Sequence, residues 1–370
     1  MQKGNIVKIL LFCLVALISF SGNANDPQKH QAEGETPHID TKTEVQNYID
    51  HHLQDAYDFT LWTDSETGEH VGFPLPVILI DEGLKIFSSS RFHHGESVAE
   101  VEGNYYKIYH NTIYKTNAAG DLSFDEEHHP TNDKPLDFSI TKNVFTILLT
   151  CILLFLLFGS LARSYRHKEI PTGIGRVLEP LVLYVRDDIA IPNIGEKKYR
   201  RFMGFLLTVF FFVWILNLLG MTPLGVNVTG NIAITACLAL FTYLITQFSG
   251  TKDYWKHIFW MPGVPILMKI ILIPIELLGT LTKPFALMVR LFANITAGHV
   301  VIMSLIALIF VTDNLVMDGP ISIFLTLFIS VIELLVAFLQ AYIFTMLSAL
   351  FIGLAVEEHD HEHPETNEIV

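Results

Sequence analysis

Long runs of apolar residues separated by short polar segments dominate the chain after residue 139. An α-helix needs roughly 20 such residues to cross a bilayer. The pattern indicates membrane helices at 140–162, in the two arms of a hairpin at 202–248, and in two longer runs, 263–311 and 321–356. The sequence therefore predicts an all-α polytopic membrane protein with about five membrane-embedded helices.

The last two runs are too long for helices that stand upright in a membrane. Residues 263–311 would form a helix of about 70 Å, whereas the hydrocarbon core is about 30 Å thick. Such a run either breaks, at Pro274 or Pro284, or tilts strongly. Because only the short outward turn 312–320 separates it from 321–356, the two runs are expected to form a tilted antiparallel hairpin.

The N-terminal part of the chain has a different character. Lys3 and Lys8 precede a short apolar stretch and then small residues, which predicts a signal peptide at 1–24. The alternative is a first transmembrane helix, but the stretch is shorter than the roughly 20 residues that a span requires. Export of 25–139 follows from this interpretation.

Residues 25–139 are polar, acidic and rich in histidine, and they contain short runs typical of strands. These runs are 77–80, 105–109 and 111–115, followed by a turn-like segment at 117–121. A small β-containing periplasmic module is predicted, with disordered flanks at 28–43 and 125–134.

No metal site or cofactor is expected. Paired histidines at 51–52, 93–94 and 128–129 have no cysteine or carboxylate at ligand spacing on a recognisable element. The 3 cysteines lie in the leader and in apolar runs, where they neither staple a secreted domain nor complete a metal site.

Charge patterning predicts the topology. Lys and Arg gather in 163–201 and in the loop 249–262, whereas the loop between the hairpin arms has neither. By the positive-inside rule these basic segments are cytoplasmic, and the module 25–139 is periplasmic. The tail 357–370 is expected to be a solvated cytoplasmic end. The formal net charge of -14 thus concerns topology and gives no sign of nucleic-acid binding.

Within 163–201, one stretch has the apolar period of an α-helix. Its stripe consists of Ile174, Val177, Leu178, Leu181, Val182, Val185 and Ile189. Such a helix either lies on the inner membrane surface or packs against its own protein, and the two interpretations are compatible.

Arg290 lies deep in the run 263–311, with mostly apolar residues on both sides. A guanidinium stays protonated in proteins, and even the mildest scale makes such a charge at membrane depth about 2.5–3.5 kcal/mol unfavourable. Snorkelling to the interface suits Lys283 better, because Arg290 is far from both ends of the run. Ionisable residues inside a membrane by default mark an ion path, and we interpret Arg290 in this way.

Helix geometry places other polar residues near Arg290. At about 100° per residue, Lys283 lies within about 20° of its face, and Glu276 and Asn294 lie within about 40°. His299 falls on the opposite face, about 13 Å closer to the outward turn.

Folding the two long runs antiparallel about Val316 pairs polar residues by depth. His299 lies as many residues before Val316 as Glu333 lies after it, and an imidazole beside a carboxylate can exchange protons. Arg290 and Gln340 fall within about one turn of each other and form a deeper level. Polar contacts that only join helices would explain Gln340 but not a permanent charge.

The motifs around these residues resemble subunit a of the F-type ATP synthases. They are Leu281–Pro284, Arg290–Asn294, Ala297–Gly298, Leu339–Phe344, the hairpin segments Trp214–Gly220 and Ile232–Thr235, and the ending Ala355–His359. The similarity covers roughly residues 137–359, and the arginine motif combined with the later Gln-Ala-aromatic motif is highly specific.

The resemblance implies a non-catalytic, proton-translocating stator subunit of a rotary ATP synthase in the cell inner membrane. Arg290 would face the carboxylate of a rotating c-subunit ring and separate an outer from an inner half-channel. Asn294 and Gln340 match polar positions nearby, Glu276 matches an acidic position of the inner exit path, and Lys283 matches the motif's lysine. The implied partners are the c ring, the b-subunit peripheral stalk, the catalytic head and membrane lipid.

The chain departs from the pattern of many bacterial members in several places. His299 and Glu333 occupy positions where those members carry Glu and His, so the pair looks exchanged. The position before the second hairpin arm, where many members carry an acid, reads Gly230–Asn231. The exported module 25–139 is also longer than the usual bacterial N-terminus.

Two other classes of function were weighed. A stand-alone secondary transporter would use Arg290 as an anion or counter-ion site, but no internal repeat of the kind common in that class is visible. A periplasmic sensor or adhesin with a membrane anchor leaves the polar residues at membrane depth unexplained. The sequence also lacks the Gly-rich phosphate loop G-x-x-x-x-G-K-[ST], so nucleotide chemistry is not expected in this chain.

Overall fold

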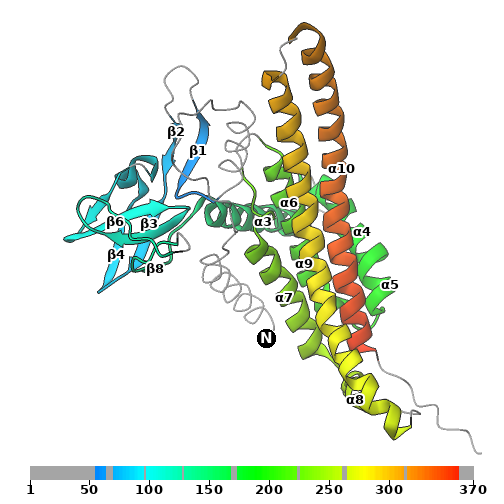
Figure 1. Ribbon diagram of the computed structural model, residues 1–370. Helices are drawn as coiled ribbons and strands as arrows, with labels where there is room; N and C mark the ends of the chain where they lie inside the picture. The colour runs from blue at the N-terminus through cyan, green and yellow to red at the C-terminus, as the bar shows by residue number, and fades with distance from the viewer. Residues whose placement is uncertain are drawn as a thin grey trace, which may run out of the picture. The chain divides into compact units, whose positions relative to one another are not determined.

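Helices form the chain after residue 141 in the computed structural model (Figure 1). They are α3 (Lys142–His167), α4 (Gly175–Tyr184), the π-helix η2 (Val185–Ala190), α5 (Ile191–Ile194), α6 (Tyr199–Gly220), α7 (Ile232–Ser249), α8 (Lys252–Phe259), α9 (Ile266–Val311) and α10 (Leu315–Val356). Among the described residues 5 helices, α3, α6, α7, α9 and α10, are long and apolar enough to cross a membrane. The predicted fold class is confirmed.

The structure describes residues 55–63, 70–95, 97–126, 129–167, 173–222, 226–260, 265–311 and 315–357. The leader 1–24, the flank 28–43 and the tail beyond residue 357 lie outside these ranges, so the predictions for them stay predictions. Contacts divide the chain into a first unit (Met1–Phe158, Phe212–Cys237 and Arg290–Gln340) and a second unit (Gly159–Phe211, Leu238–Val289 and Ala341–Val370). Each unit is described by itself below.

The two longest helices differ in detail from the prediction. α9 is one helix of 46 residues that contains both Pro274 and Pro284, so the chain does not break at either proline. α10 begins at Leu315, inside the predicted turn 312–320. The turn prediction was too long because Asp318–Pro320 has the composition of a loop.

The loop predicted at 249–262 contains a helix, α8, that was missed. The Thr251 hydroxyl caps it by accepting a hydrogen bond from the Tyr254 backbone N–H at 3.3 Å. Asp253 lies in its first turn, and Lys256 and His257 lie in its last turn. These charges complement the helix dipole, and together with the cap they are a signal that the sequence contains.

In the first unit, the segment before α3 folds into small antiparallel sheets. The strands are β1 (Asp58–Thr63), β2 (His70–Pro74), β3 (Pro76–Ile80), β4 (Leu84–Ser88), β5 (Ala99–Val101), β6 (Asn104–Tyr109), β7 (Thr112–Thr116) and β8 (Leu136–Asp137). They pair as β1–β2, β4–β3–β8 and β5–β6–β7, with the 3-10 helix η1 (Ser89–Gly95) after β4. The predicted strands coincide with β3, β6 and β7, and the β-containing module is confirmed.

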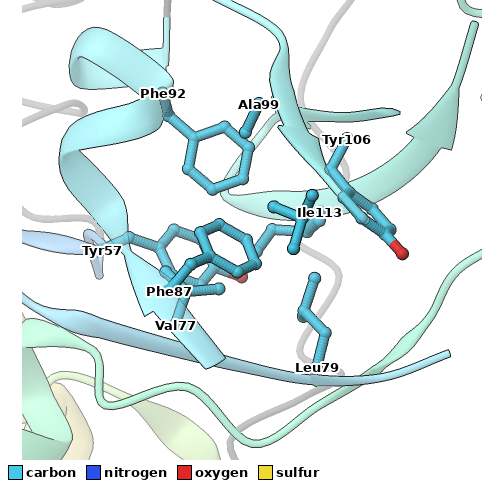
Figure 2. Packing of buried hydrophobic residues seen from close by; sticks show 9 residues of the cluster. Tyr57, Val77, Leu79, Phe87, Phe92, Ala99, Tyr106 and Ile113 are labelled. Carbon is cyan, nitrogen blue, oxygen red and sulfur yellow. The ribbon is translucent and has the colours of Figure 1, made fainter. Parts of the chain in front are cut away.

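Side chains from these strands and from η1 meet in one apolar core, as Figure 2 shows. Its members are Tyr57, Val77, Leu79, Phe87, Phe92, Ala99, Val101, Tyr106 and Ile113. β3 and β4 contribute alternate residues, because successive side chains of a strand point to opposite faces. Lys85 is buried at the edge of this core, where its Nζ donates to the Tyr106 hydroxyl at 2.8 Å, which in turn donates to Asp81 at 2.7 Å.

Two predictions about turns in the module had opposite outcomes. The turn at 117–121 is confirmed, since the Gly120 N–H donates to the Asn117 carbonyl at 3.0 Å and Gly120 has a φ of 76°. The disorder predicted for 125–134 is wrong for its described residues. Phe124 pairs with Pro130, and the Thr131 N–H donates to the Ser123 carbonyl at 2.7 Å. A polar composition concealed this hairpin because its order comes from backbone pairing.

The module is joined to the first turn of α3 by hydrogen bonds and aromatic contacts. Asp55 Oδ1 accepts from the Asn143 backbone N–H at 3.0 Å and thereby caps the helix. Burial raises the pKa of Asp55 from 3.8 to about 6, although this hydrogen bond lowers it. Phe145 lies edge-on to Phe59 and Phe73, with ring centroids 5.5 and 5.4 Å away.

In the second unit, the predicted amphipathic stripe lies on α4, η2 and α5. Leu178, Val185 and Ile189 are buried, whereas Ile174 and Val177 are 63% and 68% exposed. The stripe therefore packs against its own protein over most of its length and leaves an apolar end uncovered. Packing of the helix against its own protein is thus confirmed, and its position on the inner membrane surface stays a prediction.

Candidate functional site

The upper halves of α9 and α10, both in the first unit, run side by side in opposite directions (Figure 1). Asn294 of α9 donates from Nδ2 to Oε1 of Gln340 on α10 at 2.7 Å. Gln340 is 1% exposed whereas Asn294 is exposed, so this bond is only partly buried. The deeper polar level predicted from sequence thus contains Gln340, but its partner within the chain is Asn294, one helical turn after Arg290.

Glu333 lies two turns before Gln340 on α10 and is 6% exposed. A Cβ added to Gly298 would lie 2.6 Å from Glu333 Oε1, so the carboxyl group rests against the backbone of α9 at a residue without a side chain. Both carboxyl oxygens of Glu333 are buried and accept no hydrogen bond from the described residues. The predicted depth of Glu333 agrees to within one residue, because Gly298 precedes His299.

The side chain of His299 is outside the described part of the chain. Only its backbone, within α9, is placed. The predicted His299–Glu333 pair therefore stays a prediction.

Arg290 is exposed on the surface of α9. No hydrogen bond or ion pair joins its guanidinium to any residue in the described ranges. Asn294, one turn further along, is also exposed, whereas Leu287 and Leu291 beside Arg290 are buried. The residues that the structure describes thus supply no opposite charge to the Arg290 guanidinium.

A buried polar network that sequence reasoning missed connects α6 to α10 in the first unit. Asn217 is 1% exposed and accepts from the Thr229 hydroxyl at 3.0 Å. Its Nδ2 donates to the Ala337 carbonyl at 3.4 Å, between Glu333 and Gln340 on α10. The signal in the sequence was an asparagine in an otherwise apolar hairpin arm, within the segment Trp214–Gly220.

Glu276 and Lys283 belong to the second unit, and both are half-buried on α9. Lys283 Nζ lies 5.5 Å from the centre of the Phe351 ring of α10, a cation–π contact. Lys283 also lines a small pocket between α7, α8, α9 and α10. We call it the inner pocket; its polar lining includes Thr242, Thr246, Gln247, Tyr254, Thr280 and Lys283.

The predicted site residues thus fall into two groups. Asn294, Glu333 and Gln340 come together in the first unit, with Arg290 one turn away along α9. Glu276 and Lys283 lie further along the same helix in the second unit. No group of three or more His, Cys, Asp or Glu able to hold a metal ion occurs within the described ranges.

Comparison with known proteins decides the family. The model of the family described as ATP synthase A chain matches residues 144–353, more than half of the chain. The chain belongs to this family. It is therefore a multi-pass, non-catalytic membrane subunit of the ATP synthase, a multi-subunit complex, and takes part in proton translocation.

Similar curated proteins carry the name ATP synthase subunit a. Subunit a 2 of Chlorobaculum tepidum is 46% identical over 246 residues, which cover 64% of this chain and 69% of that protein. Subunit a 2 of Prosthecochloris aestuarii is 41% identical over 303 residues, 78% of this chain and 93% of that protein. Subunit a of Myxococcus xanthus is 44% identical over 245 residues, 63% of this chain and 80% of that protein.

The N-terminal module has a family of its own. Residues 48–138 match a domain of unknown function, DUF8433. Its bounds agree with the β-containing module that packs on the start of α3. In this subunit a the membrane part and the module are thus two recognised domains.

Proposed function

We propose that Arg290 is the charge that couples proton flow to rotation in this ATP synthase. In this proposal, two offset half-channels open to opposite sides of the membrane, and Arg290 stands between them. It attracts the ionised carboxylate of the c-subunit ring and prevents protons from passing directly from one half-channel to the other.

The observation that carries this proposal is the exposure of Arg290 on an uncovered apolar helix. Only 18% of the apolar window of α9 is buried inside the chain, against 50% for α6. A membrane helix that its own chain leaves so open faces lipid or other helices. A guanidinium is too costly to leave in lipid, so helices that supply a carboxylate are the better neighbour.

The buried polar groups support the outer half-channel. Glu333 and Gln340 bring a carboxyl group and an amide to membrane depth, and each has buried polar atoms that the described residues do not satisfy. Such groups are rare in protein interiors and usually serve a function. In the proposal, Glu333 with His299 receives protons on the periplasmic side, and Asn294 with Gln340 holds α9 and α10 in register beside Arg290.

The inner half-channel is assigned to Glu276 and Lys283, which lie further along α9. Positive segments such as Lys197–Arg201 support a cytoplasmic position for this end, with the module and its signal peptide on the periplasmic side. The c ring, the b-subunit stalk and the catalytic head are the partners in this proposal. No observation favours a stand-alone transporter over it.

Replacing Arg290 by Ala tests the proposal in inverted membrane vesicles that contain the assembled complex. We expect ATP-driven proton pumping to be lost while assembly is retained, because removing a charge at membrane depth relieves a cost of about 2.5–3.5 kcal/mol. Arg200→Ala, on the exposed first turn of α6, is the matched control and should pump normally. Coupled pumping by the Arg290 variant would refute the proposed role.

A further inference from the structure

The inner pocket combines hydroxyl, amide and phenol groups in a part of the protein that is otherwise apolar. The Thr246 hydroxyl donates to the Thr242 carbonyl at 2.8 Å, and the Thr280 hydroxyl donates to the Leu277 carbonyl at 2.8 Å. Because their hydrogens are used within their own helices, the oxygens of Thr246 and Thr280 remain acceptors toward the pocket.

Tyr254 supplies a donor to the same pocket. Gln247 Nε2 donates to the Tyr254 hydroxyl oxygen at 3.2 Å, which leaves the phenol hydrogen for another acceptor. Burial raises the pKa of Tyr254, and the nearby Tyr243 and Glu276 raise it further, against the lowering effect of Gln247. The phenol therefore stays protonated at neutral pH and lies within electrostatic reach of the Glu276 carboxylate.

The position of Tyr254 is built into the local structure. A Cβ on Gly250 would lie 2.7 Å from Tyr254 Cδ1 and 3.2 Å from the Gln247 carbonyl, so only glycine leaves room for the ring. Thr251, the cap of α8, donates from its backbone N–H to the Ala355 carbonyl at the end of α10 at 2.9 Å. The phenol is thus held at the pocket by contacts with two other helices.

We propose that the inner pocket is the mouth of the inner half-channel and that Tyr254 relays protons between Glu276 and bulk water. When Glu276 passes a proton to the phenol oxygen, the phenol's own proton leaves to bulk water. The reverse sequence carries a proton from bulk water to Glu276. The phenol begins and ends neutral, so no other reactant is needed. This inference rests on the proposed function, because it extends the path assigned to Glu276.

Lys283 gives the pocket its selectivity in this arrangement. Its ammonium group is bound over the Phe351 ring and has no carboxylate within ion-pair distance among the described residues. The fixed positive charge disfavours entry of metal cations, whereas a proton can be passed along hydrogen bonds without a free cation occupying the pocket.

The test compares Tyr254→Phe with the parent complex in inverted vesicles. Phenylalanine keeps the ring and removes only the hydroxyl. With assembly unchanged, we expect passive proton conduction after removal of the catalytic head to fall roughly fivefold to tenfold, the factor for one lost hydrogen bond. We also expect a larger ratio of rates in H₂O and D₂O, since proton transfer at the pocket then limits the flow. Conduction and isotope ratio equal to those of the parent would overturn the inference.

Gly250→Ala provides a second route, because its methyl group displaces the Tyr254 ring while the phenol is kept. The same fall in conduction is expected, with no further fall when Gly250→Ala is added to Tyr254→Phe; additive losses would contradict the relay. Tyr165→Phe is the matched control, since its hydroxyl bonds Glu179 outside the pocket. Arg290→Ala, measured beside these, separates the two proposals. If it loses pumping while Tyr254→Phe conducts normally, only the relay fails.

Discussion

Replacing Gly298 by Ala tests whether the position of the Glu333 carboxyl group governs proton entry. The new methyl group would lie 2.6 Å from Glu333 Oε1, against about 3.4 Å for ordinary contact, so the carboxyl group must move by about 0.8 Å. Misplacement of a reacting group by about 1 Å costs up to about 100-fold in rate. We therefore expect passive proton conduction to fall about tenfold to 100-fold.

The effect on stability should be much smaller. Alanine in place of glycine stabilises a helix interior by about 0.5–1 kcal/mol, whereas overpacking costs about 1–3 kcal/mol. The net cost is expected to be about 2.5 kcal/mol at most, so the complex should assemble. Proton conduction in head-stripped vesicles is the assay, with the amount of assembled complex measured in the same membranes.

Gly279→Ala is the matched control on the same helix. A Cβ at this glycine meets nothing within 4 Å, so conduction should not change. Adding Glu333→Asp to Gly298→Ala should restore part of the conduction, because the shorter side chain withdraws from the methyl group. Equal conduction by the Gly298 and Gly279 variants would show that the position of Glu333 does not matter.

Three further predictions concern other parts of the chain. The free energy of unfolding of the module should fall as pH rises from about 4 to about 6, because folding raises the pKa of Asp55 from 3.8 to about 6. In hydrogen-exchange measurements, Asp55→Asn should remove this dependence of the unfolding free energy on pH. Phe145→Ala should destabilise the attachment of the module by about 1–3 kcal/mol, because Phe145 is half-buried, and this should be seen as faster proteolysis of β1 and β2. Phe155→Ala, at an 80% exposed position, should have no such effect. Asn217→Leu should lower the thermal stability of the complex by about 1–3 kcal/mol, since it leaves the Thr229 hydroxyl and a carbonyl of α10 without their partner; an unchanged melting temperature would contradict the network.

The membrane helices could be predicted because their signal is local. Each apolar run must satisfy its own backbone hydrogen bonds in lipid, so length and hydropathy suffice to find it. α8 was missed because it is short and polar, and the cap at Thr251 was not weighed. The strand β8 was missed because it has only two residues and pairs with the distant β3. The strands β1, β2, β4 and β5 pair with near neighbours in hairpins, and their short runs among polar residues carried too weak a signal.

The depth of the site residues could also be predicted, but their partners could not. Counting residues from the outward turn placed Glu333 at the level of His299, and in the structure Glu333 lies against the preceding residue, Gly298. The same counting placed Gln340 within a turn of Arg290, and Gln340 bonds Asn294, one turn after Arg290. The rotation of one helix against the other then selected Asn294 as the partner of Gln340. A rotation of one residue changes the facing side chain by about 100°, and nothing in the sequence of either helix determines it.

The sequence by itself determined where the membrane helices lie, the permanent charge within one of them, and the motifs of its family. These features follow from the hydropathy of a single segment and from the free-energy cost of placing its residues in lipid. Only the tertiary structure decided that Glu333 rests on Gly298, that Asn217 bridges to α10, and that Tyr254 joins the inner pocket. The physical reason is that each of these contacts joins residues far apart in the chain, and packing selects such contacts by shape after the helices have formed.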